Sequence, residues 1–244
     1  MDGPDQERVL GQLHARLQAR GRVPELPAGW RRQSAMLAAL GVAYGGDFIV
    51  ADLAPDGAHL QMVLVDVCGG GAAAVPAALG FAGALESLIS VVAPDDLLPA
   101  ANAYLLRQPS DESIATAVHV EVDLRDGQYR IRSAGHPPAL HWRTDPPGAL
   151  AWRVDNARGT ALGVTEQVDV TDSKGQLGPG DGLLFYTDGM VESRGVDIDD
   201  GIAWLRRTAG AALLAGWDGA ADRIIEQVVR GDDDRAVLLL QREG

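Results

Sequence analysis

The sequence predicts an α+β fold in which antiparallel sheets are layered with helices. Strand-like segments follow one another as hairpins, and helical segments come in pairs between groups of strands. A doubly wound parallel sheet needs a helix after each strand, so this order favours antiparallel sheets. With 244 residues, 46% of them hydrophobic, the chain can bury one large core.

The first elements are a helix and a hairpin. A helix is expected over about residues 6–20, with an apolar side formed by Val9, Leu10, Leu13 and Leu17. The prolines and glycines of "GRVPELPAGW" end it. The arms "GGDFIVADL" and "AHLQMVLVDV" then flank the turn "APDG", and the second arm is apolar enough to be buried on both faces. Two helices are expected next, over about 72–92 and 95–107.

The second half continues with strands and ends with a helix pair and a strand. Strands are expected at "SIATAVHVEVDL", "QYRIRSAG", "PALHWR", "VDVTDS" and "GLLFYTDG". The segment "WRVDNARGTALGVTEQ" is expected to be a loop, and "LGPGD" a turn. Helices over about 199–214 and 218–230 precede a closing strand, "RAVLLLQRE".

Composition limits the class of partner. The 34 acidic and 21 basic residues give a net charge of -13, which argues against nucleic acid or an anionic membrane as the main partner. The single cysteine, Cys68, excludes an internal disulfide and fits a reducing cytoplasm. No apolar run reaches the roughly 18 residues of a membrane span. A cytoplasmic protein is therefore expected.

The stretch "LVDVCGGGAAA" suggests a phosphate-binding loop, but its spacing is wrong for one. A dinucleotide fingerprint has the spacing G-x-G-x-x-G with an acid about 20 residues later, whereas here the glycines are consecutive and the acid precedes them. A Walker loop also fails, because no Gly-Lys-Ser or Gly-Lys-Thr follows.

Four acids at strand ends form a more coherent pattern. Asp47 begins the first hairpin arm and Asp66 lies at the far end of the second, so the two carboxylates are expected to be neighbours. Asp188 ends a third strand and Asp233 precedes a fourth. Acids gathered at one rim repel one another unless a cation is present. Oxygen ligands without a Cys or His cluster indicate Mg²⁺ or Mn²⁺ rather than zinc.

Five ordered motifs carry a family resemblance. "YGGDF", "VLVDVCGGGAAA", "SAGHPPAL", "LGPGDGLLFYTDGMVES" and "DDRAVLLL" resemble, in order and spacing, the SpoIIE branch of the PPM (type 2C) metal-dependent serine/threonine phosphatases. The resemblance covers roughly residues 26–242. It implies an αββα sandwich, two stacked antiparallel sheets flanked by helix layers. It also implies two Mn²⁺ or Mg²⁺ ions, with a third left open, and hydrolysis of phosphoserine or phosphothreonine on a protein.

The same resemblance assigns the catalytic metal ligands. They fall on Asp47, Asp66 as the bridging acid, the Val67 carbonyl, Asp188 and Asp233. For the last ligand, Asp232 and Asp234 remain alternatives. The two ions would activate a shared water in line with phosphorus, so no protein nucleophile is needed.

Other residues have a structural and a functional interpretation. His136 is an alternative general acid, although a structural hydrogen-bond role is preferred. Glu192 is expected to support the loop after "TDG", and Cys68 to be a small buried residue. Arg31 and Arg32 either contact phosphate or flank a strand. The chain has Cys68-Gly69-Gly70-Gly71 where the family usually has "SGHG", and Ala236 where it usually has threonine. These departures put rate and metal affinity in question.

The family resemblance also implies a partner. SpoIIE-type phosphatases commonly act on STAS-type anti-anti-sigma proteins, so such a phosphoprotein is the expected substrate. A helical extension (1–22) and a phosphatase domain (23–244) are expected. The apolar side of the first helix would dock on a partner or, more commonly, on the domain itself, and a homodimer is left open. The alternatives are a non-catalytic phosphoprotein-binding module and a hydrolase of small phosphate esters.

Overall fold

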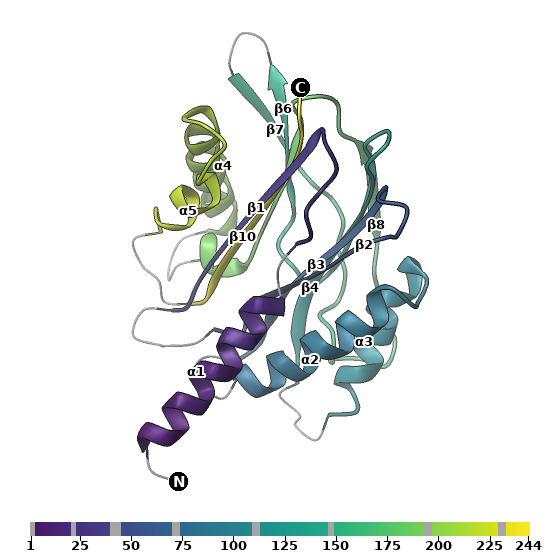
Figure 1. Cartoon of the computed structure of the whole chain (residues 1–244), viewed down its shortest axis with the longest axis vertical. Coiled ribbons are helices and arrows are strands. Elements are labelled where there is room, and N and C mark those ends of the chain that lie inside the picture. Colours follow the sequence, from purple (N-terminus) through teal and green to yellow (C-terminus); the bar gives the residue numbers. More distant parts are fainter. Residues whose placement is uncertain are drawn as a thin grey trace.

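Two antiparallel sheets lie face to face between two layers of helices (Figure 1). The fold is seen in a computed structural model that describes residues 3–20, 23–39, 45–69, 74–108, 113–145, 149–192, 197–228 and 233–244. One sheet contains, in spatial order, β1 (Trp30–Leu37), β10 (Arg235–Arg242), β9 (Gly182–Tyr186), β6 (Leu140–Asp145) and β7 (Ala149–Val154). The other contains β2 (Phe48–Leu53), β3 (His59–Val67), β4 (Ala115–Asp123), β5 (Gln128–Ala134) and β8 (Asp172–Gln176). The predicted α+β sandwich is confirmed.

Side chains that point to alternate faces of each strand form the core between the sheets. Side chains point to opposite faces at successive strand positions, so an apolar strand can serve two layers. In β3, Leu64 packs between the sheets, with Phe185 and Leu238 in the same cluster, whereas Val63 and Val65 face the helices. The prediction that this strand is buried on both faces is confirmed.

Helices cover both outer faces. The sheet that contains β3 is covered by α1 (Gly3–Arg20), α2 (Ala74–Ile89) and α3 (Leu97–Leu105), the last entered through a short 3-10 turn, η2 (Pro94–Asp96). The opposite sheet is covered by α4 (Ile198–Leu214) and α5 (Ala220–Ile225). None of the described helices is long and apolar enough to cross a membrane.

The first helix packs on its own domain. Leu17 of α1 is fully buried, in one cluster with Phe48, Phe81 and Leu85. The Phe48 and Phe81 rings meet edge to face with centroids 5.8 Å apart. Towards its N-terminus the helix leaves the sandwich (Figure 1), and Val9 there is 40% exposed. The structure thus favours self-packing for the C-terminal half of α1.

Several expected boundaries were wrong. The sequence analysis missed β1, because Arg31 to Ser34 read as polar and the strand lies at the sheet edge, paired with β10 on one side. The expected loop after residue 152 begins inside β7, and the expected strand 168–173 is shifted to β8. The last helix ends at Ile225. These edge elements are short or polar, and tertiary pairing rather than periodicity defines them.

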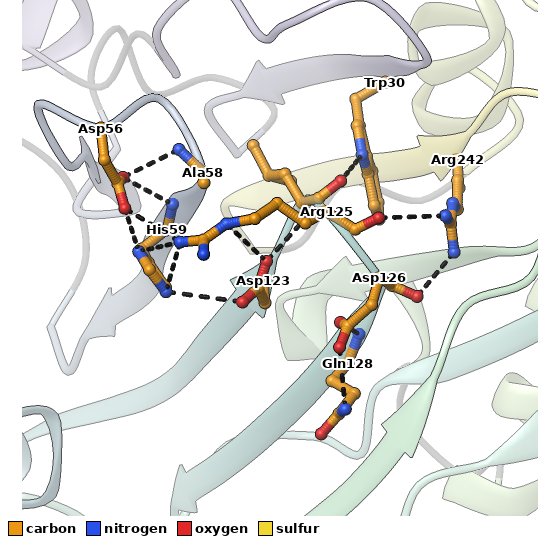
Figure 2. A network of polar contacts seen from close by, with 10 residues as sticks. Trp30, Asp56, Ala58, His59, Asp123, Arg125, Asp126, Gln128 and Arg242 are labelled. Carbon is orange, nitrogen blue, oxygen red and sulfur yellow. Dashed lines mark hydrogen bonds and ion pairs between the residues drawn. The ribbon is translucent and has the colours of Figure 1, made fainter.

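A network of polar contacts holds the end of the sandwich farthest from Asp66 (Figure 2). The Arg125 guanidinium contacts Asp56 and Asp123, while His59 lies between the same two carboxylates. The Trp30 indole N–H donates to the Leu124 carbonyl at 2.7 Å, which joins the two sheets. This end is therefore fixed by structural contacts, whereas the acids predicted from the sequence lie at the other end.

Candidate metal centre

Asp47 and Asp66 meet at the open end of the β2–β3 hairpin. The register pairs Phe48 with Val65, so the residues one step further out face each other. Burial, followed by the charge of Asp66, raises the pKa of Asp47 well above its usual value. Burial, followed by the charges of Asp188 and Asp233, raises the pKa of Asp66 to about 7. The predicted proximity of the two hairpin acids is thus seen in the structure.

The other sheet supplies two more acids to the same rim. Asp188 begins a 3-10 turn, η3 (Asp188–Met190), directly after β9, and Asp233 precedes β10, which pairs with β9. Burial, followed by the charge of Asp233, raises the pKa of Asp188 to about 6. Carboxylates that raise one another's pKa form a negative site that a cation would stabilise.

The neighbouring acid Asp234 is used differently. Its Oδ1 accepts a hydrogen bond from the Ala39 N–H at 2.9 Å, and its Oδ2 accepts one from the Gly46 N–H at 2.8 Å. Asp234 is 7% exposed, whereas Asp233 is an exposed residue. Asp233 Oδ1 also accepts a backbone hydrogen bond, from the Asp234 N–H at 2.8 Å, but Asp233 is the exposed acid, and its charge raises the pKa of Asp66 and Asp188 more than that of Asp234 does. Asp232 lies outside the described residues.

Thr187 is a functional residue that the sequence analysis missed. Its hydroxyl donates to Asp47 Oδ2 at 2.8 Å and accepts from the Ala236 N–H at 2.8 Å. Thr187 is fully buried, so this bridge fixes the Asp47 carboxylate against β10. Asp47 Oδ1 is buried, and it has no hydrogen-bond partner among the residues that the structure describes. The only sequence signal was a polar residue between the apolar strand and Asp188 in "YTDG".

Two glycines allow the close approach of these elements. A Cβ on Gly45 would lie 2.8 Å from the Asp234 carboxyl carbon, and one on Gly189 would lie 2.1 Å from the Asp234 carbonyl oxygen. Neither distance is open to a real side chain. The glycines that precede Asp47 and follow Asp188 are therefore required by the packing of the rim around Asp234.

His136 and Glu192, the secondary candidates from the sequence, both lie near the rim acids. His136 is buried, and its Nδ1 makes a 2.8 Å hydrogen bond with Thr116 Oγ1, next to Asp66 in the register. Burial lowers the pKa of His136 to about 3, so the ring is neutral near pH 7, which favours the structural role. Glu192 is exposed, and its charge helps to raise the pKa of Asp188.

The expectation for Cys68 was wrong. It is exposed just beyond β3, where its N–H donates to the Ile114 carbonyl at 2.9 Å. Residues 70–73, including the last two glycines of the motif, lie outside the described residues. Partial burial and the charge of Asp66 raise the pKa of the Cys68 thiol, so it is not activated.

The adjacent arginines do not lie at this rim. Arg31 Nε donates to Gln241 Oε1 at 2.9 Å, and its guanidinium lies 4.6 Å from the centre of the Trp217 ring. Arg32 Nε donates to the Pro24 carbonyl at 3.2 Å. Because β1 and β10 are antiparallel, Arg31 pairs with Gln241, at the far end from Asp233. Both arginines lie within β1 and do not flank a strand, but their contacts are structural, as the preferred interpretation predicted.

The acids lie along one rim of the sandwich but do not by themselves form a complete metal-coordination site. Within the residues that the structure describes, no three His, Cys, Asp or Glu side chains form a group that could by itself hold a metal ion. The donor chemistry nevertheless fits a hard cation, since the site offers carboxylate oxygens and a buried, unpartnered Asp47 Oδ1.

Comparison with known proteins decides the family. The pattern of the family described as Stage II sporulation protein E (SpoIIE) matches residues 56–243. The chain belongs to the SpoIIE family. The expected recognition and enzyme class, a serine/threonine phosphatase of the PPM type, are thereby confirmed.

Solved structures agree with the SpoIIE assignment. The RsbU and RsbW domains of Rv1364c from Mycobacterium tuberculosis match with a TM-score of 0.73 and 26% identity, over 91% of this chain and 62% of that one. The PP2C phosphatase domain of SpoIIE from Bacillus subtilis, with a fragment of its regulatory domain, matches at 0.70 and 21%, over 88% and 62%. RsbX in complex with magnesium matches at 0.65 and 15%, over 90% and 98%. The chain thus spans 62% of the first two structures and nearly all of the third.

Proposed function

We propose that this SpoIIE-family chain is a Mn²⁺- or Mg²⁺-dependent phosphatase that removes phosphate from serine or threonine of a regulatory protein. The observation that carries the proposal is the convergence of Asp47 and Asp66 from one sheet with Asp188 and Asp233 from the other. The magnesium complex of RsbX, a protein of the same fold, supports the choice of metal.

Each rim residue has a part in holding the ions. Asp47, Asp66, Asp188, Asp233 and the Val67 carbonyl would hold the ions. When bound, the ions would lower the pKa of water and neutralise charge on the phosphoryl oxygens. Thr187 and Asp234 position the ligands, since they fix Asp47 and the chain before it. His136 is buried and neutral, so the proposal gives it no proton transfer.

The substrate is proposed from the family. A phosphorylated STAS-type anti-anti-sigma protein is the choice that the SpoIIE resemblance supports. A cytoplasmic location, a homodimer, a third ion and a division into residues 1–22 and 23–244 remain predictions. The alternatives are a phosphoprotein-binding module without turnover and a hydrolase of small phosphate esters.

Hydrolysis of p-nitrophenyl phosphate with Mn²⁺ or Mg²⁺ tests the proposal. Asp66→Asn should lower kcat/KM roughly 100-fold or more, because it removes a carboxylate that would hold the ions. Asp52→Asn, in β2 of the same hairpin, is the matched control and should stay near wild type. Metal-independent turnover, or an Asp66→Asn enzyme as active as the control, would refute the metal mechanism. Metal binding without any turnover would favour the binding module.

A further inference from the structure

A pocket beside the rim is not used by the proposed chemistry. It has a volume of about 570 Å³, and its lining comes from the segment after β5, the segment after β7 and the first turns of α4. His136 lies in its wall and bonds Thr116, which pairs with Asp66. On the other side, Ile202 of α4 shares a cluster with Met190 and Val191, which follow Asp188 by two and three residues. None of the four rim acids lines the pocket, but its wall is linked to Asp66 through His136 and Thr116.

The pocket wall offers apolar surface to solvent. Val154 and Ile198 both line it, and they are 39% and 40% exposed. Pro138, Ile202 and Ala203 extend the same surface. Exposed aliphatic side chains that line an open pocket commonly bind an apolar side chain of a partner.

The charged groups of the pocket favour an acidic occupant. Arg158 is exposed, and among the described residues its guanidinium has no ion pair or hydrogen bond. Within the described part of the chain, the one side-chain contact of Arg206, also in the lining, is at 3.5 Å with the Trp152 carbonyl. The Asp155 carboxylate is already held by Ser173 Oγ and the Ala157 N–H, which leaves Asp199 as the other acid of the lining.

We propose that this pocket docks the substrate segment next to the phosphorylated residue, with an apolar side chain against Val154 and Ile198 and an acidic side chain on Arg158. The inference rests on the proposed phosphatase function and deepens it by naming the local sequence that the enzyme prefers. Arg158 would act on substrate affinity and not on the chemical step, because it stands on the pocket wall and not among the rim acids.

Charge reversal at Arg158 tests the pocket. The probes are p-nitrophenyl phosphate and two phosphoserine peptides that carry leucine and either glutamate or lysine within three residues of the phosphoserine. Arg158→Glu should lower kcat/KM for the glutamate peptide about five- to tenfold relative to p-nitrophenyl phosphate, mainly through KM, and should favour the lysine peptide. Arg207→Glu, an exposed α4 position outside this pocket with the same charge change, is the control and should keep the wild-type preference.

The outcomes separate the two proposals. Equal peptide preferences in Arg158→Glu and Arg207→Glu, with p-nitrophenyl phosphate still hydrolysed, would overturn the pocket and leave the phosphatase intact. Absence of metal-dependent hydrolysis in the wild type would instead overturn the phosphatase proposal. A change of oligomeric state in Arg158→Glu by light scattering, without a change of peptide preference, would show that a second copy occupies the pocket and would also overturn the inference.

Discussion

The hydroxyl of Thr187 connects the two sheets at the metal rim, and its removal should be costly. Thr187→Val keeps the size and shape of the side chain but removes the donor to Asp47 Oδ2 and the acceptor of the Ala236 N–H, both at 2.8 Å. Thr187 is fully buried, so water cannot replace either contact. A buried donor left without a partner costs about 1–3 kcal/mol, and a typical hydrogen bond contributes about 0.5–1.5 kcal/mol.

The expected loss for Thr187→Val is therefore about 2–4 kcal/mol in the free energy of unfolding. Thr187→Ser is the matched control, because it keeps both hydrogen bonds and loses one buried methyl group, at about 1 kcal/mol. Urea unfolding at pH 7.5 in EDTA measures both values without metal. If the valine variant is as stable as the serine variant, the bridge does not hold the rim and the reasoning is wrong. With Mn²⁺, the valine variant should also bind metal more weakly than the serine variant, because Asp47 is no longer fixed.

Three further predictions follow from the rim and the buried histidines. Gly45→Ala should weaken Mn²⁺ binding, measured by calorimetry, since the new Cβ would lie 2.8 Å from the Asp234 carboxyl carbon. Gly57→Ala is the control: its Cβ would meet no described atom within 4 Å, so Mn²⁺ affinity should stay unchanged despite the positive φ of Gly57. The pKa of Asp66 is raised to about 7 and that of Asp188 to about 6, so both proposed ligands are protonated at pH 5. Mn²⁺ should therefore raise Tm more at pH 8 than at pH 5. Equal increases in Tm at the two pH values would contradict the ligand assignment. Burial lowers the pKa of His119 to about 3, so the folded protein gains stability from a neutral His119 above the unfolded pKa of about 6.5 and loses it as pH falls towards 3. Between pH 7 and pH 5, urea unfolding should therefore show a loss of stability about 2 kcal/mol smaller for His119→Gln than for wild type. An equal loss in both proteins would contradict a buried neutral ring.

Some features followed from the sequence because they depend on local patterns. Apolar alternation around the turn "APDG" fixed the β2–β3 hairpin and, with it, the approach of Asp47 to Asp66. The long apolar strands and helices were also found, since their periodicity is strong over many residues. The five ordered motifs gave the family, which the match over residues 56–243 confirms.

Other features depended on contacts between residues distant in the chain. The sequence "GDDD" could not assign a role to Asp234, because that role arises from hydrogen bonds to Ala39 and Gly46 across the fold. The bridge from Thr187 to Asp47 joins residues 140 positions apart and has no local signature. The edge strand β1 exists because β10 offers it hydrogen-bonding partners, although Arg31 to Ser34 are polar. Local propensity and periodicity thus determined the elements and the acids they carry, whereas packing across the two sheets decided that Asp234 holds the distant backbone of Ala39 and Gly46 and that Asp47 is fixed by Thr187.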